Sequence, residues 1–98
     1  MLLVDAMNTF NPALAVLKEK GYSLGIGPST VKEGEEPDTY YSVGFWFARK
    51  GDRVFQGESP VALLGLVAMW EARGEDWRTR PGENYVSRIM EGEFGDEF

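Results

Sequence analysis

The residue types that most often carry catalysis or bind metals are absent from this 98-residue chain or lie in polar loops. The sequence has no His and no Cys, which excludes imidazole-based triads, thiol nucleophiles and thiolate metal sites. Carboxylates gather in residues 33–38 and at Glu75 and Asp76, and paired carboxylates can hydrolyse glycosides or hold a divalent cation. Neither cluster has a recognised ligand spacing. We therefore predict no enzyme, no catalytic or metal-binding residue and no cofactor, and keep a small enzyme or ligand-binding domain with a carboxylate site as an alternative.

Phosphate recognition has little support in the sequence. The stretch GIGPS contains a G-x-G, but no helix that could receive a phosphate follows it. Basic residues form two small clusters, which are Arg49, Lys50 and Arg53, and Arg73, Arg78 and Arg80. The net charge of −6 repels a phosphate backbone at long range. We interpret both clusters as solvated surface and do not expect nucleic acid as the partner.

Two helices are predicted by the same boundary residues. In the first, Asn11 is a suitable N-cap, Pro12 fits the first helical position, and Gly21 ends the helix. In the second, Ser59, Pro60 and Gly74 take the same three roles. A short amphipathic helix is expected within residues 83–92.

The region between the two longer helices alternates with the period of β-strands. Strands are predicted at residues 22–27, 39–49 and 53–56, with a polar, mobile loop at residues 28–38. The short connections favour an antiparallel meander. We predict an α+β two-layer sandwich, with a three-stranded antiparallel sheet covered by helices on one face (α-β-β-β-α plus a short C-terminal helix). Residues 1–92 form its single domain, and residues 93–98 form an acidic, frayed tail.

The predicted order αβββα, over residues 11–73, resembles the topology of the double-stranded RNA-binding domain. In that family, a lysine-rich start of the last helix grips phosphates. The matching position here reads Glu58-Ser59-Pro60, which is acidic and contains no lysine. The resemblance therefore implies RNA binding as an alternative function but assigns no RNA-binding residue.

The helix expected after Ser59 is apolar nearly all round but has two different sides. Leu63 and Val67 belong to a bulky side, which we expect to pack on the sheet. Gly65 and Ala68 belong to a side of small residues, which we expect to lie against the first helix. As an alternative, the small side is a surface for a second copy or another partner.

The outer face of the predicted sheet is the candidate binding site. If Phe45 and Phe47 face the helices, together with Tyr41 and Val43, strand alternation turns the other residues outward. The proposed partner-binding residues are Tyr40, Trp46 and Phe55. Exposed aromatic side chains of this kind are typical of protein interfaces. The alternative is that terminal segments of the chain already cover Trp46.

The sequence favours a small non-enzymatic, protein-binding domain of bacterial type, such as an adaptor, an inhibitor, or an immunity- or antitoxin-like protein. Its expected partner is another protein or a second copy of itself. No apolar run is long enough to span a bilayer, and the first residues lack the features of a signal peptide. We therefore expect a cytoplasmic protein with no membrane partner.

Overall fold

The computed structural model describes residues 1–27 and 45–92. Along the chain, a 3₁₀ turn η1 (Met7–Thr9) leads into helix α1 (Phe10–Glu19) and strand β1 (Ser23–Gly27). Strands β2 (Phe45–Lys50) and β3 (Arg53–Gly57) precede helix α2 (Pro60–Arg73), a 3₁₀ turn η2 (Gly74–Asp76) and helix α3 (Tyr85–Met90). The predicted α+β class and the order of its elements are confirmed.

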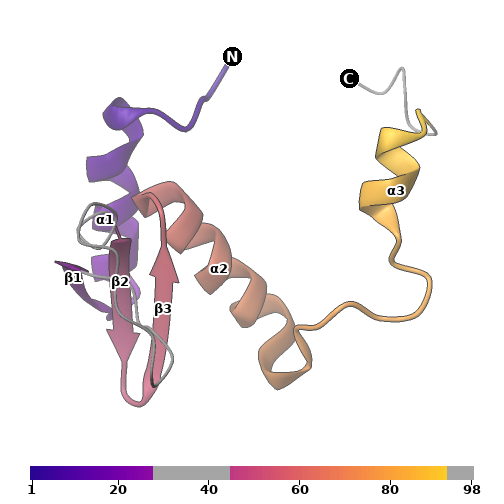
Figure 1. Ribbon diagram of the computed structural model, residues 1–98. Coiled ribbons are helices and arrows are strands. Elements are labelled where there is room, and N and C mark those ends of the chain that lie inside the picture. The colour runs from indigo at the N-terminus through magenta and orange to yellow at the C-terminus, as the bar shows by residue number, and fades with distance from the viewer. Residues whose placement is uncertain (28–44, 93–98) are drawn as a thin grey trace, which may run out of the picture.

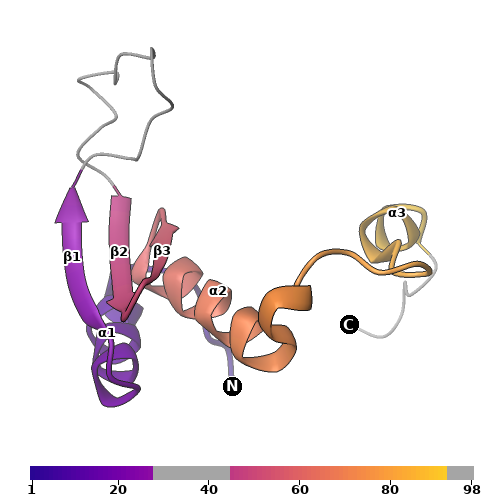
Figure 2. The same cartoon turned by 90° about the horizontal axis from the view of Figure 1, so that it is seen from below.

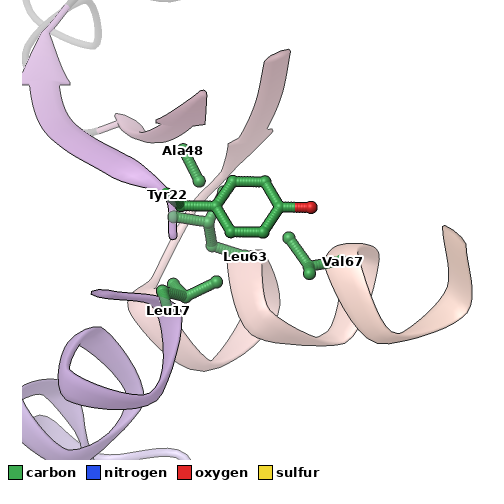
Figure 3. Close-up of a cluster of buried hydrophobic side chains, with 5 residues drawn as sticks. All are labelled: Leu17, Tyr22, Ala48, Leu63 and Val67. Atoms are coloured by element: carbon green, nitrogen blue, oxygen red, sulfur yellow. The ribbon is translucent and has the colours of Figure 1, made fainter. Parts of the chain in front are cut away.

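The three strands form one open antiparallel sheet in the order β1-β2-β3. Helices α1 and α2 lie together on one side of this sheet, α1 nearest β1 and α2 along β3 (Figures 1 and 2). The core lies between these two layers. Its buried cluster, drawn in Figure 3, consists of Leu17, Tyr22, Ala48, Leu63 and Val67.

Helix α2 begins and ends as its sequence predicts. The Ser59 side chain accepts a hydrogen bond of 3.0 Å from the backbone N–H of Ala62, and Pro60 occupies the first turn. Gly74 follows the helix with φ of 62°, a left-handed conformation that glycine adopts at low cost. Leu63 and Val67 are fully buried, so the predicted bulky side does form the core.

Helix α1 begins earlier than predicted. Asn11 is not its N-cap, because the turn η1 runs directly into the helix and Thr9 occupies the cap position. The Thr9 hydroxyl donates to the carbonyl oxygen of Ala6 at 2.6 Å. The predicted end at Gly21 is confirmed, since Gly21 has φ of 94°.

The face of the sheet that packs against the helices is the one that the sequence predicted to be the outer face. The residues in contact with the core on this face are Leu24, Trp46, Ala48 and Phe55. Phe45 and Phe47 alternate with Trp46 and Ala48 along β2, so they lie on the other face. The prediction that Trp46 and Phe55 share one face of the sheet is confirmed, but the assignment of that face to the outside is wrong.

Aromatic contacts with α1 and with the start of the sheet account for this choice of face. Trp46 packs on Phe10, and Phe55 packs on Tyr22, so both side chains turn toward the core. Helix α2 also approaches β3 closely on this face, since a Cβ added to Gly57 would lie only 2.9 Å from the backbone nitrogen of Leu63. Position 57 therefore has no room for a side chain.

Several predictions fall outside the described residues. These are the loop at 28–38, the residues Tyr40, Tyr41 and Val43, and the tail at 93–98. Among the helices of the described ranges, none has the length and apolar composition required to cross a membrane.

Candidate protein-binding surface

Two of the three predicted partner-binding residues are part of the packed interior. The Trp46 ring makes an edge-to-face contact with Phe10 of α1, with ring centroids 5.9 Å apart. Phe55 makes a similar contact with Tyr22, also at 5.9 Å. Helix α1, and not a terminal segment as the alternative interpretation had it, therefore packs against Trp46. Tyr40 lies outside the described residues. Trp46 and Phe55 therefore belong to the face that packs on the core and not to an outer patch.

The open surface lies instead on helix α2. Five residues along one side of this helix are exposed, and we call them the open face of α2: Ala62, Gly65, Ala68, Met69 and Ala72. Among the described residues, no atom outside the helix lies within 4 Å of the position that a Gly65 Cβ would occupy. The expectation that this small side packs on α1 is therefore wrong.

Helix α1 meets α2 on a different side. Pro12 and Val16 of α1 and Val61 and Leu64 of α2 line a shared hollow of about 440 Å³. Lys20 beyond the end of α1 pairs with Glu71 of α2 at 2.9 Å. These contacts leave the open face of α2 without a cover among the described residues.

A second apolar hollow adjoins the open face. Its volume is about 260 Å³, and its lining residues are Phe55, Leu66, Met69, Trp70 and Trp77. Met69 belongs both to this hollow and to the open face, so the two form one continuous surface. Trp77 is 43% exposed and carries the Arg78 guanidinium 4.6 Å from its ring centroid. Large aromatic side chains in an apolar hollow are favoured anchor points for a protein partner.

Helix α3 stands away from the sheet and from the other two helices (Figures 1 and 2). No residue of α3 is buried. One side of this helix, its apolar side, consists of Tyr85, Val86, Ile89 and Met90, with Val86 78% and Met90 83% exposed. The spacing of these residues in the sequence predicted the amphipathic helix but gave no sign that its apolar side would be exposed.

A network of charged groups holds the connector between α2 and α3. Arg73, the last residue of α2, donates from its two terminal nitrogens to the two carboxylate oxygens of Glu83. The backbone N–H of Arg80 donates to Glu83 at 2.7 Å, and the Arg80 guanidinium pairs with Asp76 at 3.1 Å. Two-pronged arginine–carboxylate pairs fix geometry as well as charge, so the start of α3 is held at a set position beside the end of α2.

The same hydrogen bonds shift the two ionisable groups at the centre of this network. The hydrogen bond from Arg73, with a second from the Arg80 backbone, lowers the pKa of Glu83 from 4.5 to about 2. The hydrogen bond to Glu83 in turn raises the pKa of Arg73. Both groups are therefore charged throughout the physiological range, as a structural ion pair requires.

Most of the cations in the predicted basic clusters have partners within the chain. The Lys50 ammonium donates to the carbonyl oxygen of Lys20 at 2.8 Å, and the Arg53 guanidinium lies 3.9 Å from the centroid of the Trp70 ring. Arg73 and Arg80 belong to the connector network. These four cations interact with groups of their own chain and do not together form a free basic patch.

The predicted acidic clusters do not form a metal site within the described residues. Asp76 pairs with Arg80, and the carboxylates of residues 33–38 lie outside the described ranges. Across residues 1–27 and 45–92, no three acidic side chains come together in a way that would hold a metal ion.

Comparison of the chain with models of protein families, with characterised proteins and with solved structures found no match. The protein can therefore be classified only by its own fold and surface. This is an α+β domain with a three-stranded antiparallel sheet, two covering helices and a third, outlying helix whose apolar side is exposed.

Proposed function

We propose that this protein is a non-enzymatic domain that works by binding another protein chain. The observation that carries the proposal is the exposed apolar side of α3. A helix of six residues is too short to be stable in water on its own, and it gains stability only by packing its apolar side. An interface would supply packing that α3 does not receive from the described part of the chain.

The distribution of apolar residues supports the same conclusion. In the described part of the chain, fourteen large hydrophobic residues are exposed, whereas six hydrophobic residues form the buried core. Single exposed hydrophobic residues are ordinary, but contiguous apolar patches mark interaction sites. The apolar side of α3 and the hollow beside α2 are two such patches. Adaptor, inhibitor and antitoxin-like roles all use a surface of this kind.

Site-specific photo-crosslinking tests this function. A photo-reactive amino acid would replace Val86 on α3 in one variant, and Asp52 in the exposed turn between β2 and β3 in a control variant. After irradiation in an extract of the source cells, we expect defined protein adducts from position 86 and not from position 52. Equal adducts at both positions, or none at either, would contradict the proposal.

A further inference from the structure

The charges around the hollow beside α2 indicate what binds there, an inference that rests on the binding function proposed above. Two tryptophans, Trp70 and Trp77, form part of the apolar wall of this hollow. Each carries a guanidinium group over its ring, that of Arg53 at 3.9 Å from the Trp70 centroid and that of Arg78 at 4.6 Å from the Trp77 centroid. We propose that the hollow binds an acidic segment of the partner protein, with one large apolar side chain in the hollow and its flanking carboxylates on the two arginines.

The two arginines have hydrogen-bond donors that their own chain does not use. In the described part of the chain, Arg73 and Arg80 form salt bridges with carboxylates, whereas Arg53 and Arg78 form none. The Nε of Arg53 is buried and has no hydrogen-bond partner there. A guanidinium stacked on an aromatic ring keeps its terminal N–H groups at its edge, where a carboxylate can accept two of them at once. Charge complementarity therefore favours an anionic partner at this place.

The apolar part of the hollow suits one large side chain. The remaining lining residues, Phe55, Leu66 and Met69, carry no charge, and the volume is about 260 Å³. Sites for drug-sized ligands usually measure about 300–1,000 Å³, so the hollow is on the scale of a single anchoring residue. Aromatic rings and the adaptable side chain of methionine are well suited to receive such an anchor.

The connector network holds this wall of the hollow in position. Arg73 pairs with Glu83, and the same guanidinium donates to the carbonyl oxygen of Arg78 at 3.5 Å. The backbone beside Trp77 is thereby tied to the end of α2. A wall that is ordered before binding reduces the conformational entropy lost when a peptide binds.

The net charge of −6 does not decide recognition at the hollow. At physiological ionic strength, exposed charges that lie more than about 8 Å apart are largely screened. Of the acidic residues close in sequence to Trp77, Asp76 is already paired with Arg80 at 3.1 Å. The guanidiniums on the walls therefore act on a bound segment more strongly than the distant carboxylates do.

NMR of the ¹⁵N-labelled full-length chain with synthetic peptides tests this occupant. The probe is acetyl-Glu-Glu-Phe-Glu-Glu-amide. One control peptide replaces its Phe by Ala, and the other replaces every Glu by Lys. We expect the probe to shift the indole N–H signals of Trp70 and Trp77 to saturation and to leave that of Trp46, which packs on Phe10 in the core. Neither control peptide should give a saturable shift.

A pair of arginine variants tests the charge contact. Arg78 and Arg49 are both exposed, but Arg49 pairs with Val54 on the opposite face of the sheet. Arg78→Gln should raise the dissociation constant of the probe by about two- to fivefold, and Arg49→Gln should leave it unchanged. Both variants should keep the amide spectrum of the folded chain.

Several results would overturn the proposal. These are a probe that gives no saturable shift, a Lys or Ala peptide that binds as well as the probe, and an unchanged affinity in Arg78→Gln. If the probe fails while position 86 still gives protein adducts in the crosslinking experiment, the partner binds elsewhere and the binding function stands. If the probe binds but the adducts are absent, the hollow is a peptide site and the role of α3 is wrong. If both fail, both proposals fall.

Discussion

Gly57 lies directly beneath the backbone of Leu63, so that a Cβ on Gly57 would come within 2.9 Å of the Leu63 nitrogen and 3.1 Å of its Cα. This contact sets the distance between α2 and the edge strand of the sheet. Position 57 therefore has no room for a side chain, although Trp46, its pairing partner in β2, lies on the same inward face of the sheet.

The first prediction concerns this contact. Gly57→Ala forces a methyl group against the helix backbone, which cannot yield as a flexible side chain would, and should lower the free energy of unfolding by about 1–3 kcal/mol. Gly25→Ala in β1 is the matched control, since within residues 1–27 and 45–92 no atom beyond its chain neighbours lies within 4 Å of the added Cβ. Urea unfolding of both variants is the measurement. An equally small effect at both positions would mean that α2 does not lie this close to β3.

The buried side of α2 gives a second prediction. Leu63 is fully buried in the core, and Leu63→Ala should lower the free energy of unfolding by about 2–5 kcal/mol, because it removes apolar contact and leaves a cavity. The control is Val86→Ala on the exposed side of α3, which we expect to change the stability of the dilute monomer by less than about 0.5 kcal/mol. Chemical denaturation of dilute samples compares the two. If Leu63→Ala were as stable as the control, α2 would not be part of the core.

A third prediction tests the face of the sheet directly. Trp46 packs edge-to-face on Phe10, and truncation to Ala should cost about 1.5–3 kcal/mol through lost burial. Val54 lies on the opposite face and is 49% exposed, so Val54→Ala serves as the control and should cost much less. Thermal unfolding of both variants is the measurement. If Val54→Ala lowered the stability more than the truncation of Trp46, Trp46 would face outward, as the sequence predicted.

The connector network predicts a specific dependence on pH. The pKa of Glu83 is lowered from 4.5 to about 2, so its ion pair with Arg73 stabilises the folded connector fully above pH 4.5. That stabilisation is lost as the pH falls from 4.5 through about 2, because the carboxylate takes up a proton. Carbon-detected NMR of the Glu83 carboxyl group should show a midpoint near the lower value.

The matched variant for this titration is Arg73→Gln, which keeps a polar side chain but removes the charge and the two-pronged geometry. Without the largest cause of the shift, the Glu83 midpoint should move up toward 4.5. An unchanged midpoint would show that Arg73 does not hold the connector.

The sequence was sufficient to predict the local elements but not the face of the sheet. Ser59, Pro60, Gly74 and Gly21 mark helix ends through backbone conformations that few residues satisfy, so these predictions are confirmed. Alternation along β2 separates its two faces without saying which one is buried. The bulk of Phe45 and Phe47 suggested the inner face, but Trp46 packs on Phe10 and Phe55 packs on Tyr22, contacts between distant residues that strand alternation does not reveal.

The candidate surface was only partly visible in the sequence for a similar reason. The small residues Gly65 and Ala68 pointed to a side of α2 suited to close contact, and the i,i+4 spacing of Tyr85 and Ile89 pointed to an amphipathic helix. That both sides are exposed depends on where α1 packs and on the pair between Arg73 and Glu83. Contacts between distant residues of this kind leave no periodic signal in a single sequence.

A photo-crosslinking comparison of two charge variants tests the central claim, that the apolar side of α3 binds another protein chain. In chains that carry the photo-reactive amino acid at Val86, Ile89→Asp places a charge on that side, and Leu2→Asp places the same charge at an exposed apolar residue near the N-terminus. We expect Leu2→Asp to give the same protein adducts as the chain without a charge substitution, and Ile89→Asp to remain folded and to lose them. Adducts of Ile89→Asp as strong as those of Leu2→Asp would contradict the claim.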